Sequence, residues 1–300
     1  MNNQAKAYIA ITCTTFFWGI SFITTKLALE TLTVFSYVFS RFLLASLFFL
    51  VMLKKRGLPK LDRSIIIKMV ALALLQPFGY FLFETLGLKY TSATKASLLI
   101  ALIPIVVAIT ARILLKETIR RKTLAGIILS VIGVVLLVTG GKETDLSLAG
   151  SLKGDIFILL AILSASLYMV LTKDLGKKLP SFYITAFQIF LGTLFFLPFF
   201  IADLPKMTWS EVSMRSVIGV LYNVLGGTIG GFLCYNFSLT HLKASTVAVF
   251  ANLIPIITAL GAWIILGEVL TSLQFLGGAV VIMSVLLTTS AGRRKVLPPS

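Results

Sequence analysis

Ten long apolar stretches run through the 300 residues of this chain, and the second five repeat the first five. When the chain is shifted by 151 positions, residues 102–117 match residues 253–268 at nine of sixteen places. With an odd number of membrane spans in each repeat, the second copy must lie in the membrane upside down relative to the first. The sequence therefore predicts two halves of opposite orientation that pack against each other.

Composition supports helices that cross a membrane. Hydrophobic residues make up 58% of the chain, and the mean hydropathy is +1.00. One span needs about 20 apolar residues, so ten spans leave only short connections. Continuous apolar runs favour helices, because the strands of a barrel would alternate. The predicted spans lie near 7–29, 34–53, 66–88, 93–115 and 122–140, and then near 154–173, 181–201, 215–237, 244–266 and 271–290.

These spans predict an all-α polytopic membrane protein of two inverted five-helix repeats. The first repeat covers residues 1–140 and the second covers 154–290. A polar connection over 141–153 separates them, and a basic tail follows at 291–300. At the front of each half the repeat shift is 147, and it later grows to 151. We therefore expect four additional residues in a loop of the second half.

The net charge of +16 is distributed asymmetrically among the loops. Basic residues gather in alternate connections, whereas the loops between them hold more acids. By the positive-inside tendency, this predicts a cytoplasmic membrane protein with both termini in the cytoplasm, and the charge needs no nucleic-acid partner. The basic clusters are Lys54, Lys55, Arg56, Lys60 and Arg63; Lys116, Arg120, Arg121 and Lys122; Lys173, Lys177 and Lys178; and Arg293, Arg294 and Lys295.

Several motifs resemble the EamA-type branch of the drug/metabolite transporter superfamily. The fourth span runs from Tyr90-Thr91-Ser92-Ala93-Thr94-Lys95-Ala96-Ser97 through Pro104 to Leu115-Lys116-Glu117, and the ninth runs from Leu242-Lys243-Ala244-Ser245 through Pro255 to Leu266-Gly267-Glu268. The first span contains Phe17-Trp18-Gly19-Ile20-Ser21-Phe22. The resemblance implies ten helices with cytoplasmic termini. It also implies export or uptake of small metabolites, often amino acids.

Two departures narrow what the resemblance implies. Short multidrug relatives use a glutamate in the first span, but this chain has no acid there before Glu30, at its outer end. Phosphate-translocating relatives place basic residues deep in the ninth and tenth spans. Here residues 252–263 and 273–287 contain no Lys or Arg. Exchange of cationic drugs through a first-span glutamate and transport of phosphorylated substrates are therefore both disfavoured.

Ionisable residues inside spans are costly and are functional candidates by default. Arg41 and Glu84 both fall in the outer halves of their spans, and Lys26 lies near the outer end of the first. A structural pair of Arg41 with Glu84 is one interpretation, and Lys26 can simply snorkel to the interface. The other interpretation is a gate or a site for a substrate carboxylate. Glu84 is also the candidate for coupling transport to protons.

Uncharged polar and aromatic residues supply further candidates for the walls of a cavity. Gln76, Tyr80 and Glu84 have the i, i+4, i+8 spacing of one helix face. Hydrogen bonding between helices is the alternative for each polar group, and packing is the alternative for each aromatic ring. The other candidates are Trp18, Tyr168, Tyr222, Asn223 and Asn252.

Other features carry structural expectations. Pro104 and Pro255 should kink the fourth and ninth spans at the centre of the molecule. Glu117 and Glu268 should support the N-terminus of the helix that follows each of them. Gly126 with Ser130 allows close helix contact, either within the chain or in a homodimer.

The features together favour a secondary transporter that works by alternating access, with a site between its inverted repeats. Its substrates would be small metabolites, amino acids first, with export favoured over import. A facilitative channel or a membrane scaffold remains the alternative. We expect no enzyme activity, cofactor or metal, because His241 is the single histidine and no metal-binding motif occurs.

Overall fold

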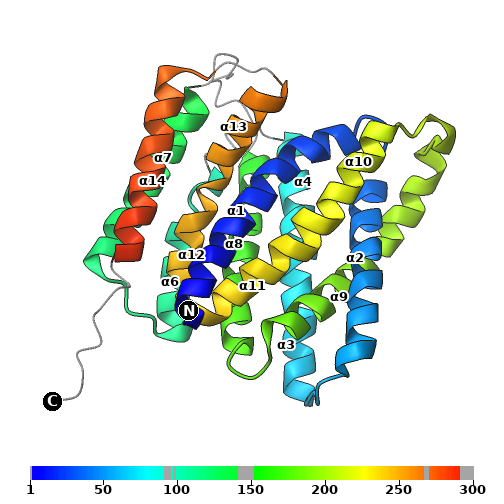
Figure 1. Ribbon diagram of the computed structural model, residues 1–300, viewed down its shortest axis with the longest axis horizontal. Coiled ribbons are helices and arrows are strands. Elements are labelled where there is room, and N and C mark those ends of the chain that lie inside the picture. The colour runs from blue at the N-terminus through cyan, green and yellow to red at the C-terminus, as the bar shows by residue number, and fades with distance from the viewer. Residues whose placement is uncertain (1, 91–95, 97–98, 141–151, 267–269, 291–300) are drawn as a thin grey trace.

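The computed structural model describes residues 2–90, 96, 99–140, 152–266 and 270–290, and within these ranges every regular element is a helix (Figure 1). The first repeat contains α1 (Asn3–Ala28), α2 (Val34–Arg56), α3 (Arg63–Ala73), η1 (Leu74–Gly79), α4 (Tyr80–Tyr90), α6 (Ile103–Leu115) and α7 (Arg121–Thr139). The second contains α8 (Leu152–Leu175), α9 (Ser181–Asp203), η2 (Leu204–Lys206), η3 (Trp209–Glu211), α10 (Met214–Tyr222), η4 (Asn223–Gly230), α11 (Gly231–His241), α12 (Ala244–Ala251), α13 (Ile254–Leu266) and α14 (Ser272–Ser290).

The described residues form nine helical spans that are long and apolar enough to cross a membrane, and α6 is a shorter apolar helix within the predicted fourth span. This confirms the predicted all-α polytopic fold. Helix starts are fixed by local chemistry. The side chains of Asn2, Thr33 and Asp62 accept hydrogen bonds from backbone amides in the first turns of α1, α2 and α3. These caps satisfy donors that have no partner within the helix.

Helices of one repeat pack against helices of the other. The equivalent helices α2 and α9 form one pair and α7 and α14 form another, whereas α6 packs against α12, the helix that precedes its own counterpart α13. α1 packs against α10 and α11, as its counterpart α8 packs against α4. The pair α7–α14 lies at one end of the molecule and α2 and α9 lie toward the other, with α1, α8, α11 and α12 between them (Figure 1). α14 ends on the side where α1 begins, which we call the N-terminal side (Figure 1).

Two predicted spans are less regular than the sequence indicated. The third span is interrupted by the π-helical segment η1 and the eighth by η4. These segments occupy corresponding positions in the two repeats, because residues 74–79 shifted by 151 are residues 225–230, which lie within η4. The two interruptions lie between helices α3 and α4 and between α10 and α11, near the middle of the molecule.

The four additional residues of the second half lie in the connection between α9 and α10. α2 ends at Arg56 and α9 at Asp203, a shift of 147, whereas α3 begins at Arg63 and α10 at Met214, a shift of 151. This longer connection folds back onto the start of α2. Met207 is buried there, and Asp203 accepts a hydrogen bond from the Phe35 amide at 3.3 Å.

Glycines bring α7 and α14 into direct backbone contact. A Cβ atom on Gly277 would lie 2.5 Å from the Leu137 amide nitrogen and 2.7 Å from the Gly133 carbonyl oxygen. Gly126 faces α14 in the same way, because a Cβ there would lie 2.1 Å from Thr288 Oγ1. Gly126 therefore serves packing within the chain, which is the first of the two roles predicted for it.

We predict that Gly277→Ala destabilises the protein by about 1–3 kcal/mol, because the added methyl group must push two backbones apart. The measurement is the midpoint of thermal unfolding of purified protein in detergent. Gly278→Ala is the matched control, since a Cβ there meets nothing closer than Ile256 at 3.9 Å. Equal midpoints for the two variants would contradict the close contact between α7 and α14.

Candidate functional site

The two interrupted spans expose backbone carbonyls at the centre of the molecule, and side chains of the opposite repeat satisfy them. Trp18 Nε1 donates to the Gly227 carbonyl at 2.9 Å. Ser164 Oγ donates to the Leu75 carbonyl at 2.8 Å, and Gln188 Nε2 donates to the Gln76 carbonyl at 3.2 Å. Each π-helical segment is therefore held by the first or second span of the other repeat. The candidate site is built around these two segments.

Arg41 lies on α2 and reaches the segment η4. Its side chain is buried, its Nε donates to Thr228 Oγ1 at 2.8 Å, and its Nη1 donates to Tyr37 Oη at 3.3 Å. The guanidinium also lies over the rings of Tyr37 and Phe42, with centroid distances of 5.9 and 5.6 Å. Among the described residues, no carboxylate lies within ion-pair distance of it. A buried cation held only by neutral groups retains its capacity to bind an anion.

A free acceptor lies close to this cation. Asn223 is fully buried, and its Nδ2 donates to Thr24 Oγ1 at 2.8 Å and to the Gly219 carbonyl at 2.9 Å. Its Oδ1 has no hydrogen-bond partner. A Cβ atom on Gly227 would lie 3.0 Å from that Oδ1 and 3.4 Å from Arg41 Nη2. A donor group and an acceptor without a partner thus both lie beside Gly227, where a larger residue would crowd them.

Aromatic rings extend from this position toward Gln188, which binds the other π-helical segment, η1. The Trp18 ring contacts Tyr235 and Phe232, with centroid distances of 4.8 and 5.3 Å. Tyr235 in turn stacks on Tyr168 at 6.2 Å with an interplanar angle of 4°. The rings come from α1, α8 and α11, so they lie between the repeats. Trp18 therefore links the two parts of the centre. It donates to the Gly227 carbonyl near Arg41, and its ring contacts Tyr235, which stacks on Tyr168.

Tyr168 lies in a buried polar network that joins α8, α9 and α11. Its hydroxyl lies 2.5 Å from Asn236 Oδ1 and 3.2 Å from Gln188 Oε1, and its single proton can serve one of them at a time. Asn236 Nδ2 donates to Gln188 Oε1 at 3.0 Å and to Thr185 Oγ1 at 2.9 Å. All of these side chains are fully buried. For Tyr168, the structure therefore favours hydrogen bonding between helices over direct exposure to a ligand.

The possible pair of Arg41 with Glu84 is not formed. Glu84 Oε1 instead accepts a hydrogen bond from the Tyr80 hydroxyl at 3.0 Å, within α4. The single face predicted for Gln76, Tyr80 and Glu84 is wrong for Gln76. Its backbone is extended (φ −151°, ψ 125°) because the helix is interrupted before Pro77, so the i, i+4 relation to Tyr80 is lost. Lys26 is exposed on α1, as snorkelling requires.

The remaining predicted residues lie farther from Arg41 or take structural partners. Tyr222 is half-buried, and its hydroxyl donates weakly to the Phe17 carbonyl at 3.4 Å. Asn252 is buried, and its Nδ2 donates to Ser130 Oγ of α7 at 3.0 Å. Pro255 is the second residue of α13, after the break that follows α12. Pro104 holds the same position in α6.

Glu117 joins the two repeats on the N-terminal side of this centre. Its Oε1 accepts from the Ala244 amide at 3.1 Å, and its Oε2 accepts from Ser245 Oγ at 3.4 Å. Glu117 thus caps α12 of the other repeat. The prediction that it supports the helix that follows it is wrong, because the end of α6 lies beside the start of its partner α12. Glu268, the counterpart, lies outside the described residues.

The burial of the ninth span differs between its two halves. Every residue of α12 from Ala244 to Phe250 is buried. Most residues of α13 from Ile254 to Gly261 are half-exposed, as are Tyr80 and Glu84 on α4. Lys243 Nζ adds a link on the N-terminal side by donating to the Thr118 carbonyl at 2.5 Å. Within the ninth span, the helix on the N-terminal side is therefore enclosed, whereas the helix on the opposite side is partly exposed.

The predicted site residues did not include three residues that shape this centre, namely Thr228, Gln188 and Tyr235. The repeat itself carried a signal for two of them. Gln188 is the counterpart of Arg41 at a shift of 147, and Tyr235 is the counterpart of Glu84 at a shift of 151. Among the described residues, no group of three or more His, Cys, Asp or Glu side chains could hold a metal ion.

Comparison with known proteins places this architecture in a family. The model of the EamA-like transporter family matches residues 5–139 and again residues 152–290. An uncharacterized transporter of Archaeoglobus fulgidus is 32% identical over 290 residues, which cover 96% of this chain and 98% of that protein. The uncharacterized transporter YetK of Bacillus subtilis is 29% identical over 294 residues, covering 96% and 88%.

A solved structure shows that the fold is shared with more distant proteins. It superposes with a TM-score of 0.78 at 15% sequence identity, and it covers 96% of this chain and 99% of its own. At that identity the likeness concerns the fold alone. The two matches of the family model, one in each repeat, establish the relationship, and the chain belongs to the EamA-like transporter family.

Proposed function

We propose that this multi-pass membrane protein is a secondary transporter of small metabolites, with amino acids as the first candidates and export as the favoured direction. It would work in the cytoplasmic membrane, with both termini in the cytoplasm. The observation that carries the proposal is the buried Arg41 guanidinium, which has no carboxylate partner among the described residues. A buried charge of this kind is costly in a membrane and is kept where it has a use.

The chemistry around Arg41 favours a substrate with a carboxylate and a donor group. The guanidinium nitrogen Nη2 can donate to a carboxylate. Asn223 Oδ1 is free to accept from an ammonium group and approaches the same position at Gly227. An α-amino acid carries both groups on adjacent atoms. The rings of Trp18 and Tyr235 would face the apolar part of such a substrate.

The difference in packing between the two sides supports alternating access. The start of α12 is buried and capped by Glu117, whereas α13 and α4 are partly exposed on the opposite side. An inverted repeat can exchange these two conditions, because the same helices occur once in each orientation. In this proposal the structure represents a state open to the outside. Rocking of the two repeats would open the cytoplasmic side next.

Two other functions remain to be separated from this one by measurement. A facilitative channel would also span the membrane, but its flux would rise linearly with concentration. A membrane scaffold would show no flux. Catalysis finds no support in His241, which is exposed and whose Nδ1 lies 2.9 Å from Thr240 Oγ1 and 2.8 Å from the Phe237 carbonyl oxygen.

The proposed function is tested by counter-exchange in proteoliposomes. Vesicles are loaded with a mixed pool of amino acids and related metabolites, and the efflux of each is followed by mass spectrometry with and without a pH gradient. We expect saturable efflux of a few amino acids that is stimulated by the same compound outside. Efflux of none of them would exclude the favoured substrate class, and linear, unsaturable efflux would indicate a channel.

Arg41→Gln should abolish this exchange, because the amide can still donate to Thr228 but cannot hold a carboxylate. Hydrogen bonds to charged groups contribute about 1.5–3 kcal/mol, so a loss of roughly tenfold or more is expected. Arg41→Lys keeps the charge and should retain part of the activity. Lys26→Gln, which removes an exposed charge from α1, is the control. Transport by Arg41→Gln equal to that of the parent would remove Arg41 from the site.

Glu84→Gln tests proton coupling. The amide oxygen of glutamine can still accept from the Tyr80 hydroxyl, so the fold around α4 should persist. We expect the variant to keep counter-exchange but to lose the acceleration of net efflux by an inward proton gradient. The comparison is made in the same vesicles at matched protein density. A variant that still responds fully to the gradient would show that coupling does not pass through Glu84.

A further inference from the structure

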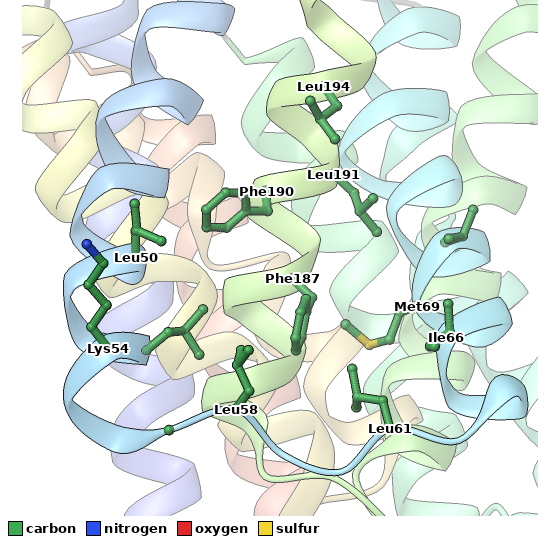
Figure 2. Close-up of a pocket in the computed structure, with 13 residues that line it drawn as sticks. Leu50, Lys54, Leu58, Leu61, Ile66, Met69, Phe187, Phe190, Leu191 and Leu194 are labelled. Carbon is green, nitrogen blue, oxygen red and sulfur yellow. The ribbon is translucent and has the colours of Figure 1, made fainter.

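A groove on the N-terminal side lies apart from the central site and has no assigned role. It is formed by the end of α2, the loop that follows, the start of α3 and the first half of α9 (Figure 2). Its volume is about 730 Å³, which falls in the range of ligand pockets. Its wall includes Leu50, Leu61, Ile66, Met69, Phe190 and Leu191, and Lys54 is the only wall residue with a polar side chain.

The groove opens on the outer, apolar surface of the helix bundle. Leu50, Ile66 and Leu194 in its wall are exposed, with exposed fractions of 39%, 48% and 58%. Leu58 and Leu61, in the loop between α2 and α3, close its lower end, while Leu50 and Phe190 approach each other from α2 and α9 (Figure 2). An apolar concavity of this kind, open to hydrocarbon, accommodates an acyl chain.

The end of the groove carries a concentration of positive charge. Residues 54–63 include the five basic residues Lys54, Lys55, Arg56, Lys60 and Arg63 and one acid, Asp62, for a net charge of +4. Arg56 lies over the Phe182 ring at 4.3 Å, and Asp62 caps α3 through the Ile65 amide. Within the described part of the chain, no ion pair involves Lys54, Lys55 or Lys60, and all three are exposed. Their charges are available to a ligand.

The corresponding connection of the second repeat has no comparable cluster of unpaired basic residues. The segment between α9 and α10 is four residues longer, buries Met207 against the start of α2, and pairs Lys206 with Asp203 at 2.9 Å. Its charges are thus partly neutralised within the chain. The repeat alone therefore does not account for the unpaired basic cluster of the first half.

We propose that this groove binds an anionic phospholipid of the cytoplasmic leaflet, with an acyl chain along the apolar wall and the headgroup among Lys54, Lys55 and Lys60. Basic clusters at the cytoplasmic ends of membrane helices attract anionic headgroups, and buried methylene groups add affinity. The groove lies on the surface between α2, α3 and α9. This inference rests on the proposed orientation, with both termini in the cytoplasm, but it does not depend on the transported substrate.

The test uses full-length protein in vesicles of brominated phosphatidylglycerol or brominated phosphatidylcholine, since bromine quenches tryptophan fluorescence on contact. Leu58→Trp places a reporter at the end of the groove, and the three native tryptophans are subtracted with the parent protein. We expect stronger quenching by the anionic lipid. Lys54→Gln/Lys60→Gln should lower this preference by roughly fivefold for each charge removed.

Matched variants separate the groove from general surface charge. Arg121→Gln/Lys122→Gln removes two exposed charges from the same side of the molecule, at the start of α7, and should keep the preference. Leu191→Phe should fill the groove and weaken quenching by both lipids, whereas Ile128→Phe, on the exposed face of α7, should not. Equal quenching by the two lipids would overturn the proposal. So would the same loss in the α7 charge variant, because the attraction would then belong to the whole surface.

Discussion

The fold depends on one constraint, which is that backbone polar groups inside a membrane must find partners within the protein. The third and eighth spans break the regular helix at η1 and η4 and thereby free carbonyl groups near the centre. Trp18 satisfies Gly227, while Ser164 and Gln188 satisfy Leu75 and Gln76. Because each partner comes from the opposite repeat, these bonds also hold the two repeats together.

The inverted repeat makes this arrangement nearly symmetric, and its departures from symmetry mark the candidate site. Arg41 and Gln188 are counterparts, and each hydrogen bonds to the interrupted third span of the other repeat. One position carries a charge and the other an amide. Trp18 likewise corresponds to Ala165. A substrate has no twofold symmetry, so a binding site between two related halves requires such unequal residues. The groove beside α9 is also a departure from symmetry. The connection after α2 carries an unpaired basic cluster, whereas the corresponding connection after α9 pairs Lys206 with Asp203.

Much of the fold could be predicted from the sequence because its signals are local. The length of the apolar runs predicts the membrane spans. The change in the repeat shift from 147 to 151 predicts that a loop of the second half is four residues longer. Arg41 could be selected because a charge within a span is rare. Its partner could not be selected in this way. The approach of Arg41 to Thr228 rather than Glu84 depends on how α2 packs against η4, and no pattern in either segment encodes that contact.

The interruptions of the third and eighth spans also could not be predicted in detail from local sequence patterns. Pro77 within an apolar run was visible, but the extended backbone of Gln76 was not, so Gln76 was placed on a helix face that does not exist there. The prediction for Glu117 was wrong for a related reason. Its carboxylate was assigned to the next helix in the chain, whereas its partner α12 lies 127 residues away in sequence.

The sequence by itself determined that this is a membrane protein of ten helices in two inverted repeats, because hydropathy and repetition are properties of the chain alone. It also determined which charges lie within the apolar spans. The tertiary structure decided which of those charges are paired, which carbonyls need a partner, and which half of the ninth span is enclosed. Most of those outcomes depend on contacts between residues 89 or more positions apart in the sequence, and the energy of such contacts exists only once the two repeats have packed.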